Sequence, residues 1–160
     1  KKKVYSVSSG KRINIECKLY LDILWPCLDN IINNNILNNN SMVCKLIYKN
    51  FSMLFTGDIE EIAEKAILEK YTDNNILEAN VLKVAHHGSK TSSTIDFLKT
   101  VSPKISLIGV GEDNSFGHPS KSTINNLNAL NCKIYRTDKN GEITITSNGE
   151  NIKIKKFIND

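Results

Sequence analysis

Short apolar segments that end in polar turns recur along this chain and limit the folds that it can adopt. The segment Val81–Ala85 ends in two histidines and a glycine, and Lys104–Val110 is followed by the turn that holds the third histidine. Between them, Thr94–Val101 has one apolar face at helical spacing. Strands that alternate with helices in this way form a layered α/β protein. We therefore predict a mixed β-sheet with helices packed on it.

The same patterns predict the remaining elements. The predicted helices are Ile59–Tyr71, Thr94–Val101 and Lys121–Leu130. The predicted strands are Val4–Val7, Ile13–Leu24, Met42–Tyr48, Ser52–Phe55, Val81–Ala85, Lys104–Val110, Lys133–Thr137, Glu142–Thr146 and Asn151–Phe157. Leu28–Asn40 is predicted to be a loop with at most one helical turn. Lys49-Asn50, Asn140-Gly141 and Asn148-Gly149 are predicted turns.

Length and composition are those of one globular domain, or part of one. The chain has 160 residues, 40% hydrophobic, and a net charge of +4, which permits an anionic substrate without requiring one. No apolar stretch approaches the roughly 18 residues that a membrane-spanning helix needs. The four cysteines have no paired spacing, so we expect simple thiols rather than disulfides or a cysteine metal site. The start, Lys1-Lys2-Lys3, leads us to expect part of a longer protein.

One aspartate and all three histidines stand where predicted strands end. Asp58 follows one strand, His86 and His87 follow the next, and His118 lies in a turn after a third. α/β folds gather side chains for metals and substrates at such strand ends. We therefore expect Asp58, His86 and His118 to converge at one rim of the sheet.

Asp58 has two interpretations. It precedes a predicted helix, and Glu61 stands three residues on, which is the spacing of a capping box. A carboxylate at a strand end can also bridge two metal ions, because it offers two oxygen donors. The local sequence leaves both interpretations open.

The histidine pair is harder to explain as structure alone. Adjacent residues of a strand point to opposite sides, so His86 and His87 cannot both be core residues. One could bind a metal while the other faces substrate. Gly88 indicates a close backbone approach or an unusual dihedral angle. Lys90 stands beside the pair and could attract a phosphate.

The other polar residues of these turns have simpler local interpretations. Ser93 and Ser120 are expected to cap the helices that follow them. His118 alone would be an ordinary turn histidine before a helix. His118 is a candidate site residue because Asp58, His86 and His87 also follow predicted strands.

Three motifs occur in a characteristic order and spacing: Leu54–Glu60, Leu82–Ser92 and Phe116–Ser120. Together they resemble the metallo-β-lactamase-fold domain of ComEC-type DNA-internalisation competence proteins. The segments Asn38–Val43 and Ile134–Gly141 are also similar, and the resemblance covers about residues 24–146.

The resemblance implies an αβ/βα sandwich with a site for two divalent metals, zinc or else manganese. Asp58 matches the bridging aspartate, and one of the histidine pair matches a later ligand. His86 is favoured as that ligand because it directly ends the strand. His118 matches a position near the site, and the resemblance implies that His87 and His118 are catalytic residues that stabilise charge or the leaving oxygen. Ser89, Lys90 and Asn40 are the expected substrate-binding residues.

The main ligand signature of that family, His-x-His-x-Asp-His, is absent from this chain. The resemblance therefore implies a single domain, residues 1–160, that is the C-terminal part of the hydrolase domain. Asp58 and one histidine supply two ligands, whereas a closed zinc site takes about four. We expect the upstream half of the domain to supply the rest, and the 160 residues alone to be inactive.

The implied activity of the intact parent is metal-dependent hydrolysis of DNA phosphodiesters during DNA uptake. Its implied partners are DNA and a membrane channel region of the parent. Its implied place is a soluble domain at the extracellular face of the membrane, with a cytoplasmic or secreted domain as alternatives. Two rival functions stay open: another hydrolase of the superfamily, acting on a phosphoester or ester of a glycan or small molecule, and a non-catalytic module.

Overall fold

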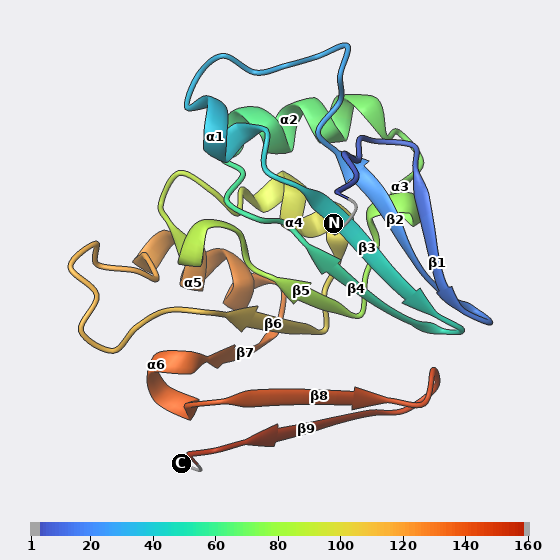
Figure 1. Cartoon of the computed structure of the whole chain (residues 1–160). Helices are drawn as coiled ribbons and strands as arrows, with labels where there is room; N and C mark the ends of the chain where they lie inside the picture. Colours follow the sequence, from blue (N-terminus) through green and yellow to red (C-terminus); the bar gives the residue numbers. More distant parts are fainter. Residues whose placement is uncertain (1–3, 159–160) are drawn as a thin grey trace.

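A seven-stranded mixed sheet runs through the protein, with its strands in sequence order (Figure 1). The computed structural model describes residues 4–158. The strands are β1 (Arg12–Glu16), β2 (Leu19–Trp25), β3 (Val43–Tyr48), β4 (Phe51–Phe55), β5 (Val81–Lys83), β6 (Ile105–Ile108) and β7 (Lys133–Arg136). Neighbours are antiparallel from β1 to β4 and parallel from β4 to β7. The predicted mixed α/β sheet is confirmed.

Helices connect the parallel strands, as the alternating pattern predicts. They are α2 (Glu61–Lys70) and α3 (Asn74–Leu77) before β5, α4 (Ile95–Val101) before β6, and α5 (Lys121–Ala129) before β7. The short α1 (Ile36–Asn39) lies in the asparagine-rich loop, and α6 (Thr137–Asn140) follows β7. None of the helices between residues 4 and 158 is long and apolar enough to cross a membrane.

The two faces of the sheet are covered differently. In Figure 1, α1, α2 and α4 lie above the sheet, and a hairpin of β8 (Ile143–Ser147) and β9 (Ile152–Lys156) lies below it. Leu54 and Leu82 enter the large core with the helices. Met53 and Val81, one position earlier, enter a smaller cluster with residues of the hairpin. This is the alternation of a strand that is buried on both faces.

The N-terminal strand predictions need two corrections. Val4–Val7 is not a strand, and the Val4 side chain is 93% exposed. Ile13–Leu24 is not one strand but the hairpin of β1 and β2, which turns at Cys17 and Lys18. Lys18 adopts a φ of +62° there. The alternating pattern continues through this turn without the usual glycine or asparagine, so it concealed the break.

Three further predictions at element ends are wrong. The Val81–Ala85 strand ends at Lys83, and Ala85–Gly88 forms a 3₁₀ turn, called here the histidine turn. Ser93 does not cap α4; Thr94 does, by accepting a hydrogen bond from the backbone N–H of Phe97. Asn140-Gly141 ends α6 rather than forming a tight hairpin turn.

Other local predictions are confirmed. The Lys49-Asn50 turn joins β3 to β4, and the Asn148-Gly149 turn joins β8 to β9. Ser120 caps α5 by accepting from the backbone N–H of Thr123. The four cysteines are free thiols. Lys1-Lys2-Lys3 lies outside the described residues.

Candidate functional site

Asp58 is presented by a tight turn after β4. Gly57 adopts a φ of +54°, and a Cβ atom there would lie 2.6 Å from the Ser41 Oγ. That same Oγ accepts a hydrogen bond from the backbone N–H of Asp58 at 2.9 Å. The turn therefore depends on a glycine and on a serine from the start of the preceding hairpin.

The capping interpretation of Asp58 is wrong. The N-cap position of α2 is Glu60, two residues after Asp58, and no side chain caps that helix. The capping-box spacing of Asp58 and Glu61 therefore has no counterpart in the structure.

The histidine turn lies directly beside this aspartate turn. The backbone N–H of His86 donates to the carbonyl oxygen of Gly57 at 3.0 Å, which joins the ends of β4 and β5. His86 and His87 both adopt positive φ values, +45° and +54°. Such values are uncommon for residues other than glycine and occur where the surrounding structure imposes them.

The prediction that the two histidines point to opposite sides of a strand is wrong, because both lie in the histidine turn. Their ring centroids are 6.5 Å apart with 64° between the planes. They nevertheless have different neighbours. His87 Nδ1 lies 2.6 Å from the carbonyl oxygen of Gly109. Because a carbonyl only accepts, Nδ1 carries the proton in this bond and the neutral His87 ring has an unprotonated Nε2.

His118 completes the group of rings. Its centroid lies 5.8 Å from that of His86, and the Phe116 ring stacks on it with centroids 5.8 Å apart and 15° between the planes. Asn114 holds the loop in place, because its side chain accepts from the His118 N–H and donates to the His118 carbonyl oxygen. Burial lowers the pKa of His118, and the nearby His86 and His87 lower it further. This imidazole therefore tends to stay neutral.

At the carboxyl ends of the parallel strands the structure thus places Asp58 and His86 on adjacent turns, and His118 with its ring beside that of His86. Lys83, at the end of β5, lies in the same region and donates from Nζ to the Val84 carbonyl oxygen. Burial lowers the pKa of the Lys83 ammonium, while the carboxylate of Asp58 opposes this shift. Lys83 was not among the predicted site residues, although a lysine within an apolar strand indicates a buried charge that needs a partner.

The three expected substrate-binding residues have different surroundings. Ser89 is buried, and its hydroxyl bonds to Thr91. Lys90 is exposed at the rim of an open hollow beside α2. The Asn40 side chain bonds to the backbone of Ile32 and Ile36 and closes its own loop. Their role in binding substrate stays a prediction.

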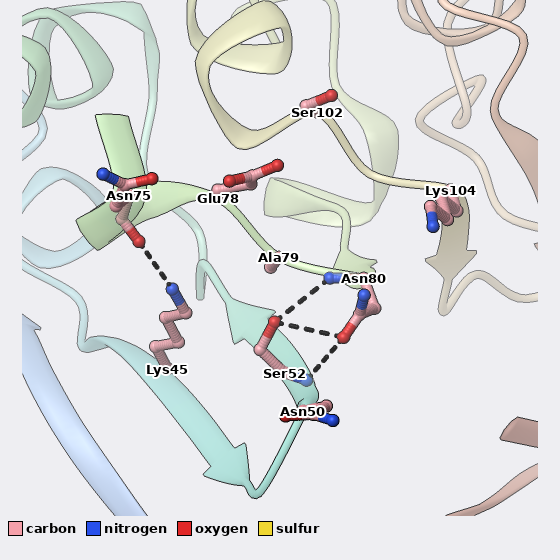
Figure 2. Close-up of a pocket in the computed structure, with 9 residues that line it drawn as sticks. All are labelled: Lys45, Asn50, Ser52, Asn75, Glu78, Ala79, Asn80, Ser102 and Lys104. Carbon is pink, nitrogen blue, oxygen red and sulfur yellow. Dashed lines mark hydrogen bonds between the residues drawn. The ribbon is translucent and has the colours of Figure 1, made fainter. Parts of the chain in front are cut away.

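A separate polar cavity has a volume of about 320 Å³. Figure 2 shows the residues that line it, and none of them belongs to the histidine turn or the Asp58 turn. It is lined by Asn80, just before β5, and Lys104, just before β6, so it lies at the opposite ends of the parallel strands from the histidines. The buried Lys45 Nζ donates there to the carbonyl oxygens of Asn75 and Ile76. No predicted site residue lines this cavity.

The residues at the histidine end fit one side of a metal site. His86 offers an imidazole on the turn after β5, and its Nδ1, the one buried side-chain nitrogen or oxygen in the described part of the chain without a hydrogen-bond partner, lies 3.7 Å from the Glu60 Oε1. Asp58 adds a carboxylate on the adjacent turn. Within residues 4–158, however, no three His, Cys, Asp or Glu residues form a group that could hold a metal ion. Two donors are fewer than the roughly four of a closed zinc site.

Comparison with known proteins relates this chain to competence proteins. No protein-family model matches it. Over 106 residues, 66% of this chain, it is 34% identical to ComE operon protein 3 of Bacillus subtilis and 35% identical to competence protein ComA of Neisseria gonorrhoeae. Over 121 residues it is 29% identical to recombination protein 2 of Haemophilus influenzae.

These matches cover only 13% to 15% of the length of the relatives. The chain is therefore similar to a short region of ComEC-type competence proteins, which confirms that part of the expected resemblance. The metallo-β-lactamase fold stays a prediction.

Proposed function

We propose that this chain forms part of a metal-dependent phosphodiesterase that hydrolyses DNA during DNA uptake. The observation that carries the proposal is that Asp58 and His86 stand on adjacent, hydrogen-bonded turns at the ends of β4 and β5, with the ring of His118 5.8 Å from that of His86. Imidazole and carboxylate donors at strand ends are suited to hydrolytic metals.

Asp58 and His86 would hold the metals in this proposal. When bound, two divalent ions, zinc or manganese, would activate water and neutralise phosphate charge. The water oxygen would attack phosphorus and give its proton to an unprotonated imidazole nitrogen of His87 or His118, and the bond from phosphorus to the leaving oxygen would break. The same imidazole, now protonated, would stabilise the developing charge and return the proton to the leaving oxygen.

The remaining ligands would come from residues outside this chain. Two donors from Asp58 and His86 leave the coordination sphere incomplete, and the chain spans a small part of the length of its relatives. We propose that another segment of the same protein supplies them. The relatives' names support a competence protein, and we propose a domain at the extracellular face beside a membrane channel region.

DNA as the substrate is supported by the relatives' names and by one exposed ring. Phe116 is 80% exposed and stacks on His118. Exposed aromatic rings beside phosphate-binding groups can stack on nucleobases. A phosphate at the histidine turn would therefore place a neighbouring base within reach of Phe116.

Hydrolysis assays on the complete gene product test this proposal. Linear DNA and bis(p-nitrophenyl) phosphate should both be cleaved with zinc or manganese, and a chelator should abolish cleavage. His86→Ala should remove activity, whereas Asp29→Asn, at an exposed position far along the chain, should not.

The 160-residue chain alone should not cleave either substrate. Cleavage by the complete protein that survives both the chelator and His86→Ala would overturn the proposal. A folded, metal-free and inactive complete protein would favour the non-catalytic alternative.

A further inference from the structure

The unpartnered nitrogen of His86 faces a carboxylate. Its Nδ1 lies 3.7 Å from Oε1 of Glu60, which is beyond hydrogen-bond distance but close enough for an ion pair. Hydrogen bonds of functional groups are often long before a ligand binds and tighten afterwards. Glu60 is therefore the acceptor that this buried nitrogen meets.

The carboxylate of Glu60 is held in position from both sides. Its Oε1 accepts from the Thr91 hydroxyl at 3.0 Å, and its Oε2 accepts from the Asn39 Nδ2 at 3.2 Å. The Asn39 Oδ1 accepts from the Glu60 backbone N–H at 2.9 Å. These bonds reduce the freedom of the Glu60 side chain, which makes no cap on its own helix.

The orientation of the Asn39 side-chain amide is fixed, and this decides which of its atoms donates to Glu60 and which accepts. Asn39 is fully buried in α1, and its backbone carbonyl oxygen accepts a hydrogen bond from the Trp25 indole N–H at 2.7 Å. Its Nδ2 also donates to the Asn34 carbonyl oxygen. Because its Oδ1 accepts from a backbone N–H, its Nδ2 can only donate to Glu60. The asparagine-rich loop thereby contributes to the candidate site.

We propose that Glu60 is a positioning residue for His86. It holds the proton on Nδ1 and so leaves Nε2 as the nitrogen that binds a ligand. A carboxylate behind an imidazole commonly has this effect on metal-binding histidines, by fixing the tautomer and the ring orientation. The part of the inference that concerns metal rests on the proposed function; the part that concerns the tautomer does not.

The variant Glu60→Gln gives a sharp test, because the direction of the Asn39 amide determines how the new amide must lie. The Gln oxygen would face the Asn39 Nδ2, so the Gln NH₂ would face Thr91 and His86. A donor would then replace the acceptor in front of Nδ1. The tautomer of His86 should change from the Nδ1–H form to the Nε2–H form.

Nitrogen-detected NMR of the imidazoles in the metal-free 160-residue chain measures this change. The wild-type chain should show His86 as the Nδ1–H tautomer, and Glu60→Gln should show the Nε2–H tautomer. Glu61→Gln, one residue along at an exposed position, is the matched control and should leave His86 unchanged. Amide spectra check that each variant is folded, and Glu60→Ala, with no acceptor, should give a mixture.

A purely structural role for Glu60 would alter stability without changing the tautomer. The Nε2–H form in the wild-type chain, or the same tautomer in all folded variants, would overturn the inference. In the complete gene product, Glu60→Gln should weaken zinc binding by about 10- to 100-fold. If the tautomer changes as stated but the complete protein never hydrolyses DNA, the proposed function fails and the positioning role stands.

Discussion

Gly88 and Pro119 lie so close together that a Cβ atom added to Gly88 would be 2.6 Å from the Pro119 Cβ. The carbonyl oxygen of Gly88 also accepts from the backbone N–H of Ser120 at 2.8 Å. These contacts join the histidine turn to the loop of His118. The distance between the His86 and His118 rings therefore depends on a residue that has no side chain.

Gly88→Ala should destabilise the protein by about 1 to 3 kcal/mol, because it adds a clash to an unfavourable φ of +80°. Urea unfolding measures the change. Gly10→Ala is the matched control, because Gly10 has a φ of +87° but no atom within 4 Å of the added Cβ. The control isolates the backbone strain. Equal losses in the two variants would show that the contact with Pro119 is not tight.

Glu64→Gln should destabilise the fold by about 1 to 3 kcal/mol. Glu64 is fully buried in α2, and its two oxygens accept from the backbone N–H groups of Ser93 and Thr94. A glutamine would turn an NH₂ group toward one of these donors. Glu69→Gln, exposed on the same helix, should change the free energy of unfolding little. Comparable losses in both variants would contradict this role.

The stability difference between the wild type and Glu64→Gln should also depend on pH. Burial raises the pKa of Glu64 above its ordinary value of 4.5, although hydrogen bonds from Thr94 and Ser93 oppose the shift. When the pKa of a group is higher in the folded than in the unfolded protein, the group contributes its whole stabilisation at pH values below its unfolded-state pKa. This stabilisation is lost as the pH rises through the folded-state pKa. The advantage of the wild type should therefore shrink as the pH rises above about 4.5. A growing advantage would contradict it.

Phe116→Ala should weaken binding of single-stranded DNA to the complete gene product by about 1 to 3 kcal/mol, the usual range for loss of one base–aromatic stack. Phe116→Tyr keeps the ring and should restore binding. Fluorescence anisotropy with a labelled oligonucleotide measures both. An oligonucleotide without bases should bind the wild type and Phe116→Ala equally. Equal binding of normal oligonucleotides by the two proteins would exclude a stacking role.

The sequence predicted the parallel half of the sheet well, because its patterns are local. Lys121–Leu130 has helical spacing and a serine cap, and the structure contains α5 at Lys121–Ala129 with that cap. The split of Ile13–Leu24 into two strands was missed because Lys18, an unusual turn residue, adopts the left-handed conformation. No local pattern marks that position.

The sequence predicted the site residues only where the residue type itself, an aspartate or a histidine at a strand end, indicates metal or substrate binding. The positions of Asp58, His86 and His118 at one rim follow from strand order, which the patterns reveal. The left-handed turn of the histidine pair does not, because no glycine or asparagine stands at His86 or His87 to mark the positive φ values. Glu60 was missed because its partner Asn39 lies 21 residues upstream.

The Asp58→Asn variant tests the metal-ligand role most directly. Asp58 is not the cap of α2, so the variant should keep the free energy of unfolding within about 0.5 kcal/mol of the wild type. Asparagine cannot supply an anionic bridge between two cations. Metal content and DNA hydrolysis should be measured together on the complete gene product. We predict that both fall together in a folded protein; unchanged metal stoichiometry with an unchanged rate of hydrolysis would contradict the account.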